Sequence, residues 1–168
     1  PDDRPPGGGV GHAGGNFVIT RVRASVVPSE TTRPAAQFVR VELPGREKIL
    51  SLAEVQVFSG NENIAPTGEA RQSSTAFDGS AALAIDGNTR GDFAGARSTT
   101  HTETSDNPWW ELDLQSARPV DRLVIWNRTD GNLESRLAGF TVALLDEQRA
   151  EVWRTAPTET PRPSLELS

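Results

Sequence analysis

Hydrophobic and polar residues alternate with a period of two along most of the chain. The segment FVITRVRASVV (17–27) alternates in this way, and QFVRVELPG (37–45) sets three aliphatic residues against Arg40 and Glu42 before it stops at Pro-Gly. Such alternation is typical of a half-buried β-strand. The same pattern, or a short apolar run, predicts further strands in residues 51–60, 108–114, 122–127, 139–146, 150–153 and 164–168.

The segment PWWELDL shows which face of a predicted strand is buried. Its alternation assigns Trp110, Leu112 and Leu114 to the core. Glu111 and Asp113 are then expected to face solvent, as charged side chains on the outer face of a sheet usually do.

Helical periodicity is nearly absent. No stretch of ten or more residues repeats with a period of 3.6, and only SAALAIDG (80–87) is expected to form a helical turn. The 15 Gly and 12 Pro indicate many turns. These features predict an all-β fold, an antiparallel β-sandwich or jelly roll with long loops. The longest irregular region is expected from about Asn61 to Asn107, and its polar composition favours a functional loop.

The chain is expected to hold one folded domain. Residues 1–15 are rich in Pro, Gly and charge and are predicted to form a disordered linker. Residues 16–168 are predicted to form a single β-sandwich, in which residues 16–36 are either an extra strand or the tail of a preceding domain. Because the chain starts without Met or a signal sequence, we expect a piece of a larger protein with other domains as partners.

Composition and charge exclude several classes of function. A net charge of −6 argues against nucleic acid as a partner, and no apolar run approaches the ~20 residues needed for membrane insertion. The absence of Cys excludes disulfides and thiolate metal sites. No G-x-S-x-G motif is present, and no carboxylate lies in an apolar stretch that would raise its pKa. The chain is therefore predicted not to be an enzyme.

Three polar groups remain as candidates for binding. In AIDGNTRGDF, Asp86, Asn88 and Asp92 are either oxygen ligands for Ca²⁺ or caps of their own Asp-Gly turn. In WNRTDGNLESRLAGF, Arg128, Asp130 and Arg136 present either fixed guanidinium donors or a solvated surface ion pair. The third is His101, which is either a ligand-binding side chain or a surface residue of a Thr-rich loop.

Together these motifs resemble the F-type, fucose-binding lectins within the discoidin or coagulation-factor C-type sandwich family, over roughly residues 61–145. Those lectins carry a His, 26 residues, Arg-x-Asp, about four residues, and Arg or Lys. Here 26 residues separate His101 from Arg128, Asp130 follows, and Arg136 comes after five intervening residues. The resemblance implies that His101, Arg128 and Arg136 bind a fucose-like sugar, that Asp130 holds Arg128, and that Phe93 or another loop residue covers the sugar methyl group.

The resemblance also implies a bound Ca²⁺ that braces the loops. The implied ligands are the side chains of Asp86, Asn88, Ser98 and Glu54 and the carbonyl of Leu83. In the family, the segment that carries the glutamate closes the domain, whereas here it comes first, so the chain resembles a circular permutation. The disulfide found beside the Arg-x-Asp motif in many members is replaced by GNLES (131–135).

The expected function is therefore a non-catalytic, calcium-braced module that binds a terminal glycan in an extracellular, periplasmic or cell-surface protein. The alternative is a discoidin-type structural or protein-interaction domain with a vestigial sugar site.

Overall fold

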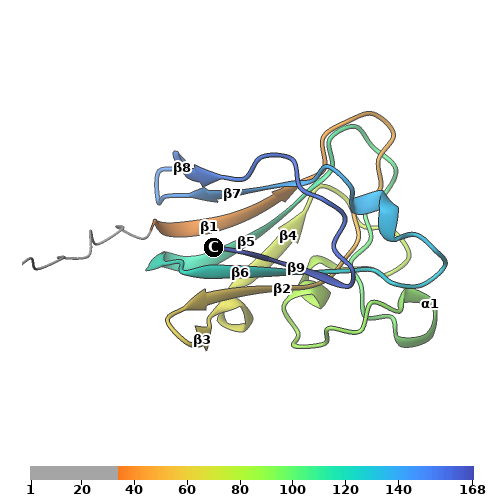
Figure 1. Ribbon diagram of the computed structural model, residues 1–168, viewed down its shortest axis with the longest axis horizontal. Helices are drawn as coiled ribbons and strands as arrows, with labels where there is room; N and C mark the ends of the chain where they lie inside the picture. The colour runs from red at the N-terminus through yellow and green to blue at the C-terminus, as the bar shows by residue number, and fades with distance from the viewer. Residues whose placement is uncertain (1–33) are drawn as a thin grey trace, which may run out of the picture. The chain divides into compact units, whose positions relative to one another are not determined.

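The computed structural model describes residues 34–168, which form two facing antiparallel β-sheets (Figure 1). The five-stranded sheet has the order β4-β5-β1-β7-β8, and the four-stranded sheet has the order β3-β2-β6-β9. The strands are β1 (Ala35–Glu42), β2 (Leu52–Ser59), β3 (Glu62–Asn63), β4 (Glu69–Gln72), β5 (Trp109–Pro119), β6 (Arg122–Asn127), β7 (Thr141–Leu145), β8 (Glu151–Arg154) and β9 (Ser164–Leu167). The all-β sandwich prediction is confirmed. The linker predicted over 1–15 and the strand predicted over 17–27 lie outside the described residues.

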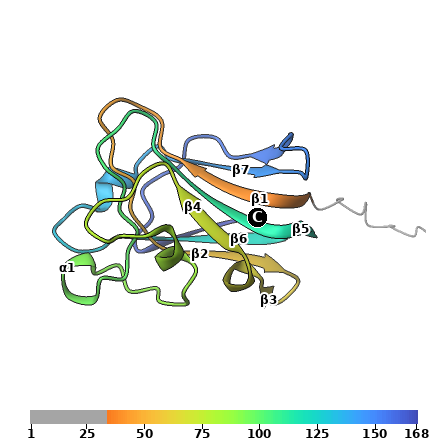
Figure 2. The ribbon, with the colours of Figure 1, turned by 180° about the vertical axis from the view of Figure 1, so that it is seen from behind.

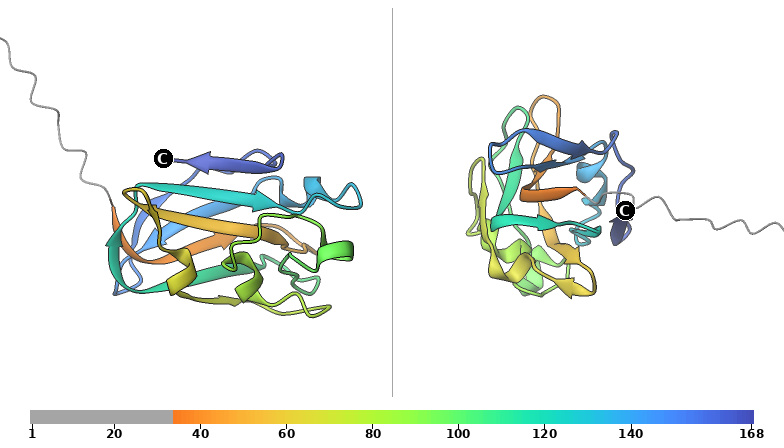
Figure 3. Two further views of the ribbon diagram at one scale, coloured as in Figure 1. Left: turned by 90° about the horizontal axis from the view of Figure 1, so that it is seen from below. Right: turned by 90° about the vertical axis from the view of Figure 1, so that its left-hand side faces the viewer.

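The core lies between the two sheets. Val41 of β1 pairs with Trp110 of β5, and both are completely buried against residues of the smaller sheet such as Val55 and Ile125. Val41 and Trp110 lie on the faces that alternation predicted to be apolar. Burial of this apolar surface is the main favourable contribution to folding. β9 pairs with β6 at the margin of the four-stranded sheet, as Figure 3 shows.

The region predicted to be irregular contains two strands, so that prediction is wrong for part of residues 61–107. Of the two, β4 has the sequence EARQ, which lacks the alternation of a strand. It forms because β5 offers a free edge along which Ala70 can pair with Leu112. A tertiary partner therefore overrides a weak local preference here.

Short helical turns complete the fold. A 3₁₀ turn, η2 (Ala81–Ala84), confirms the turn predicted within 80–87, and two further 3₁₀ turns are η1 (Ala65–Thr67) and η3 (Glu134–Leu137). The single α-helix of residues 34–168 is α1 (Phe93–Ala96), which alternation did not predict. No helix in this part of the chain is both long and apolar enough to cross a bilayer.

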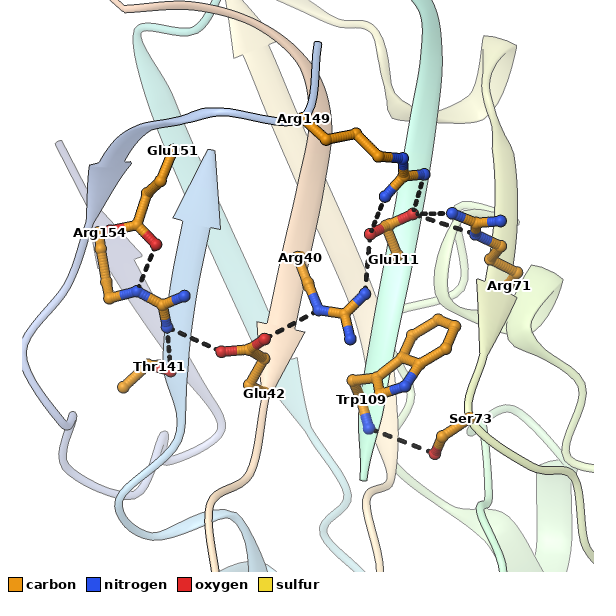
Figure 4. A network of polar contacts seen from close by, with 10 residues as sticks. All are labelled: Arg40, Glu42, Arg71, Ser73, Trp109, Glu111, Thr141, Arg149, Glu151 and Arg154. Carbon is orange, nitrogen blue, oxygen red and sulfur yellow. Dashed lines mark hydrogen bonds and ion pairs between the residues drawn. The ribbon is translucent and has the colours of Figure 1, made fainter. Parts of the chain in front are cut away.

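Glu111 is not exposed as its place in the alternation suggested. It lies on the outer face of the five-stranded sheet, opposite Arg40 of β1 on one side and Arg71 of β4 on the other. Arg149, from the turn between β7 and β8, approaches as a third arginine, and the carboxylate is completely buried beneath the three guanidiniums (Figure 4). Asp113 is half-buried and accepts a hydrogen bond of 3.0 Å from Gln37 Nε2.

The candidate binding residues gather at one end of the sandwich. This is the end where β1 and β6 finish and β2 begins. Figure 2 shows α1 and its neighbouring loops at this end, opposite the start of β1. Loops held by a rigid sheet in this way are the usual location of binding residues.

Candidate functional site

The Thr-rich segment around His101 is fixed along the start of β2. Thr100 N donates to Leu52 O at 2.8 Å, and Leu52 N donates back to the Thr100 hydroxyl at 2.9 Å. Thr102 and Leu50 repeat the arrangement at 3.0 and 2.9 Å. Because successive side chains of an extended segment point to opposite sides, His101 points away from the side on which the two threonines are held. The threonines on either side of His101 therefore fix the backbone and set the direction of its imidazole ring.

The imidazole of His101 is held in one tautomer. Its Nδ1 lies 2.8 Å from the carbonyl oxygen of Thr102, which can only accept, so Nδ1 carries the proton and Nε2 of the neutral ring is an acceptor. The side chain is 5% exposed. Burial lowers the pKa of His101 below 6.5, the positive charges of Arg128 and Arg136 lower it further, and the contact with Thr102 opposes both. The ring is therefore neutral at pH 7.

Two phenylalanines flank the imidazole. The ring centroids of Phe77 and Phe93 lie 5.1 and 5.2 Å from that of His101. Phe77 is 75% exposed and has a φ of 53°, a left-handed conformation that is rare for a bulky residue. Sequence analysis did not single out Phe77. The sequence feature that could have identified Phe77 is that Phe77 and Phe93 are the only Phe, Trp or Tyr residues in the polar stretch 61–107.

Arg128 is locked in place by Asp130. Arg128 Nε donates to Asp130 Oδ1 at 2.5 Å, and Nη2 donates to Oδ2 at 3.2 Å. The guanidinium carbon of Arg128 lies 4.6 Å from the centre of the Phe93 ring, and the side chain is buried. The sequence left open that Arg128 is a solvated surface residue. Its burial and its pairing with Asp130 exclude that alternative. A stacked, paired guanidinium offers its remaining N–H groups in a fixed direction.

Asp130 also anchors α1. Its Oδ2 accepts a hydrogen bond of 3.1 Å from Ala94 N. Burial alone would raise the pKa of Asp130, but the hydrogen bonds from Arg128 and the backbone outweigh it and lower the pKa. The ionised carboxylate therefore joins Arg128 to the helix that carries Phe93. Arg136 is exposed in η3, from where its charge also acts on His101.

Glu54 is a buried carboxylate with one oxygen left without a partner. Its Oε1 accepts a hydrogen bond of 3.2 Å from Gly87 N, whereas Oε2 has no hydrogen-bond partner. Burial raises the pKa of Glu54 to about 7, and the negative charge of Asp86 adds to this effect. The expectation that no carboxylate has a raised pKa is therefore wrong: β2 and the 86–88 turn bury this one.

Ser98 is a buried serine whose hydroxyl lies among backbone carbonyl oxygens. Ser98 Oγ contacts the carbonyl oxygens of Arg90 and Asp92, and a hydroxyl with one proton cannot donate to both. Hydroxyl and carbonyl oxygens, together with a carboxylate such as that of Glu54, are the kind of donor set that Ca²⁺ prefers.

The other implied calcium ligands have local roles as well. Asp86 Oδ1 accepts from Asn88 N at 2.8 Å, and Asn88 Oδ1 accepts from Arg90 N at 3.1 Å, so the predicted turn caps are present. Leu83 lies in η2, which packs against β2. No three His, Cys, Asp or Glu side chains of residues 34–168 cluster as a metal site by themselves. Carbonyl and hydroxyl oxygens would have to complete any site.

Gly91 joins the loop of Asp86 to the loop of Arg128. Its carbonyl accepts a hydrogen bond of 2.7 Å from Thr129 N. A Cβ at this position would lie 2.4 Å from the carbonyl oxygen of Asn127, so only glycine permits the approach. The position of the 86–92 loop is therefore transmitted directly to the residue beside Arg128.

Comparisons with known proteins agree with this architecture. Residues 83–166, half of the chain, match the family model described as a NedA-like, galactose-binding domain. The chain is 40% identical over 74 residues to fucolectin-1 of Anguilla japonica and 38% identical over 74 residues to the fucolectin of Anguilla anguilla. These matches cover 41% of this chain, 41% of the first protein and 46% of the second, so the chain spans less than half the length of these relatives.

Solved structures are similar over a larger part of the chain. The lectin domain of lectinolysin, complexed with Lewis B antigen, is 42% identical, with a TM-score of 0.62 over 65% of this chain and 77% of that domain. The fucose-binding module SpX-3 of Streptococcus pneumoniae is 38% identical, with a TM-score of 0.59 over 63% of this chain and 76% of the module. The chain therefore belongs to the NedA-like, galactose-binding domain family, among the F-type lectin and discoidin-like β-sandwiches.

Proposed function

We propose that this protein is a non-catalytic, calcium-braced carbohydrate-binding module that recognises a fucose-like sugar. The observation that carries the proposal is the fixed pair of Arg128 and Asp130 beside the neutral, buried His101. The names of its relatives support it, since fucose-binding modules share the fold at 38% identity. A glycan is the proposed partner, and the protein is proposed to act outside the cell, in the periplasm or on the cell surface.

The proposed recognition combines one acceptor with two donors. His101 Nε2 accepts a hydrogen bond from a sugar hydroxyl, because Nδ1 is engaged by Thr102. Arg128 and Arg136 donate to neighbouring sugar oxygens. Phe93, together with the exposed ring of Phe77, provides an apolar surface for a methyl group. Hydroxyls both donate and accept, so this mixed set suits a sugar better than an anion.

Calcium is proposed to act on the loops rather than on the sugar. Glu54, Asp86, Asn88, Ser98 and the carbonyl of Leu83 would hold it, and the unpartnered oxygen of Glu54 supports this assignment. The ion supplies positive charge that offsets the two carboxylates and holds the 86–92 loop in place. Through Gly91 the same loop positions the segment of Arg128. We also propose that the family order is circularly permuted here, with Glu54 reaching the ion from the N-terminal side.

The first experiment is a calorimetric titration with millimolar L-fucose, in calcium and in EDTA, of the protein and its Arg128→Lys variant. We expect binding that needs calcium and weakens at least tenfold in the variant, because lysine keeps the charge but loses the planar fork. Lysine is preferred to alanine since Arg128 is only 8% exposed and truncation would also disturb packing.

The matched control is Arg118→Lys, at the other end of the sandwich opposite Ala36 of β1, which should bind as the unaltered protein does. Unchanged binding in Arg128→Lys would contradict the assigned role of Arg128. Stabilisation by calcium without any heat from L-fucose would instead favour the discoidin-type interaction domain.

Sugar binding is expected to weaken in acid. Protonation converts Nε2 of His101 from an acceptor to a donor and adds a positive charge beside two arginines. Because the pKa of His101 lies below 6.5, the association constant should be flat from pH 8 to 7 and fall with a midpoint below pH 6.5, provided that calcium is saturating and keeps Glu54 ionised. Titrations with L-fucose between pH 8 and 4.5 test this. The His101→Gln variant, which keeps an acceptor, should lose the pH dependence; tighter binding in acid would refute the acceptor role.

A further inference from the structure

The loop formed by residues 73–79, between β4 and η2, is bonded to the backbone of His101. Ala76 N donates to His101 O, and His101 N donates to Gly79 O, each at 2.9 Å. A Cβ at position 79 would lie 2.6 Å from the Cβ of His101, so only glycine permits this approach. The 73–79 loop is therefore held directly against the residue that carries the imidazole.

This loop keeps two residues in an unfavourable backbone conformation. Phe77 and Asp78 follow each other with φ values of 53° and 59°, in the left-handed region that bulky side chains rarely adopt. Such a conformation costs energy and persists only where surrounding contacts enforce it. As a result the ring of Phe77, although 75% exposed, stands edge-on to the imidazole of His101, with 5.1 Å between the ring centroids. The contacts that enforce the conformation therefore decide where Phe77 stands.

Gln72, the last residue of β4, supplies side-chain contacts across the loop. Its Nε2 donates to Thr75 Oγ1 and to the carbonyl oxygen of Gly79, both at 2.9 Å. The same nitrogen donates more weakly, at 3.4 Å, to the carbonyl oxygen of His101. One amide group thus joins the start of the 73–79 loop, its end and the residue that the loop encloses.

The orientation of the Gln72 amide is fixed by the acceptors around it. Carbonyl oxygens can only accept, so the amide nitrogen, and not Oε1, faces Gly79 and His101. Oε1 is buried and has no hydrogen-bond partner. A buried acceptor without a partner lowers stability, and its presence calls for an explanation. The explanation that the contacts support is a role for the two donors of the same amide.

We propose that Gln72 is a positioning residue, which holds the 73–79 loop so that Phe77 stands against His101 and favours a sugar that carries a methyl group. The inference rests on the proposed function, in which the methyl group packs against Phe77 and Phe93. Gln72 itself does not touch the sugar in this assignment. Its effect reaches the ligand through the ring of Phe77, so it can be separated experimentally from the effects of residues that bind the sugar directly.

The test compares L-fucose with L-galactose, which has one more hydroxyl group, on the carbon atom of the methyl group. An apolar surface can favour the methyl form by up to about a hundredfold. We expect Gln72→Met, which keeps the length of the side chain but has no donors, to lower this preference at least about twofold, the weakest coupling usual between residues in contact. The backbone hydrogen bonds between the loop and His101 remain, so the variant should fold.

A double-mutant cycle separates positioning from general damage. In the Phe77→Ala protein, Gln72→Met should not change the preference further, because Gln72 acts through that ring. The matched control is Gln37→Met, which removes a half-buried amide that donates to Asp113 Oδ1 at the other end of the sandwich and should leave the preference unchanged. Thr75→Val, at an exposed position, removes one acceptor of Gln72 and should lower the preference in the same direction without endangering the fold.

Calorimetric titrations of the two sugars, in calcium, give the preference as a ratio of association constants. Binding of L-fucose with an unchanged ratio in Gln72→Met and Thr75→Val would overturn this inference alone. An equal loss in Gln37→Met, or a further loss when Gln72→Met is added to Phe77→Ala, would also overturn it. Absence of L-fucose binding to the unaltered protein would overturn the proposed function and this inference with it.

Discussion

Replacing Glu111 by glutamine is expected to lower the free energy of unfolding by about 3–5 kcal/mol, the loss typical of breaking a buried ion-pair network. The carboxylate accepts from Arg71 at 2.5 Å, from Arg40 at 2.9 Å and from Arg149 at 2.9 Å (Figure 4). Glutamine keeps the volume but leaves three positive charges without their shared counter-charge. Denaturant unfolding at pH 7 measures the effect.

The same network predicts a stability loss in strong acid. Burial would raise the pKa of Glu111, but the hydrogen bonds and charges of Arg149, Arg71 and Arg40 lower it from 4.5 to about 2. A carboxyl group whose pKa is lower in the folded state stabilises the fold at pH values above its unfolded-state pKa. This stabilisation is lost as the pH falls through the folded-state pKa. The protein should therefore lose about 3 kcal/mol between pH 4.5 and 2, and Glu111→Gln should lack this component.

Glu151→Gln is the matched control for Glu111→Gln. Glu151 pairs with Arg154 at 2.7 Å on the same face of the sheet, but its side chain is 43% exposed, whereas that of Glu111 is 1% exposed. Surface pairs contribute about 0–1 kcal/mol, so this change should be nearly silent. Equal effects of the two substitutions would show that the burial of Glu111 is not what makes it important.

Without calcium, stability is expected to fall as pH rises from about 4.5 to 7. The pKa of Glu54 is raised to about 7 in the folded protein, so the folded state holds a proton that the unfolded state has lost. Ionisation of this carboxylate should cost about 3 kcal/mol by pH 8. Calcium should restore the loss, because it binds the ionised form. Melting temperatures from pH 5 to 8, in EDTA and in calcium, measure both effects.

The Glu54→Gln variant isolates this contribution. His101 has a lowered pKa and gives an opposite slope below pH 6.5, so the difference between the protein and the variant is the decisive quantity. In EDTA at pH 8 the variant should be the more stable of the two, and calcium should stabilise it little. If calcium stabilises Glu54→Gln as strongly as the unaltered protein, Glu54 is not a ligand.

Local patterns in the sequence predicted most of the strands and the buried face of two of them. The alternation in QFVRVEL and PWWELDL assigned Val41 and Trp110 to the core, where they pair across two strands. It did so because side-chain direction along a strand depends only on position within that strand. The resemblance to the F-type lectin motif, which rests on the spacing of His101, Arg128 and Asp130, identified residues that the structure brings to one end of the sandwich.

Tertiary structure alone decided which polar residues became buried and paired. Arg40, Arg71 and Arg149 are scattered along the chain, and they converge on Glu111 only because β1 and β4 flank β5 and the turn between β7 and β8 folds over it. No local pattern encodes strand order.

Contacts between distant segments also set the environment of the loop residues. Phe77 reaches His101, and Glu54 is buried beside Asp86, through contacts between segments that are distant in sequence. The sequence by itself determined the apolar, inward-facing residues of strands such as β1 and β5 and the chemical groups that are available for binding. Only the tertiary structure decided which of those groups lost their solvent and gained partners, because burial and pKa depend on neighbours that the order of strands brings together.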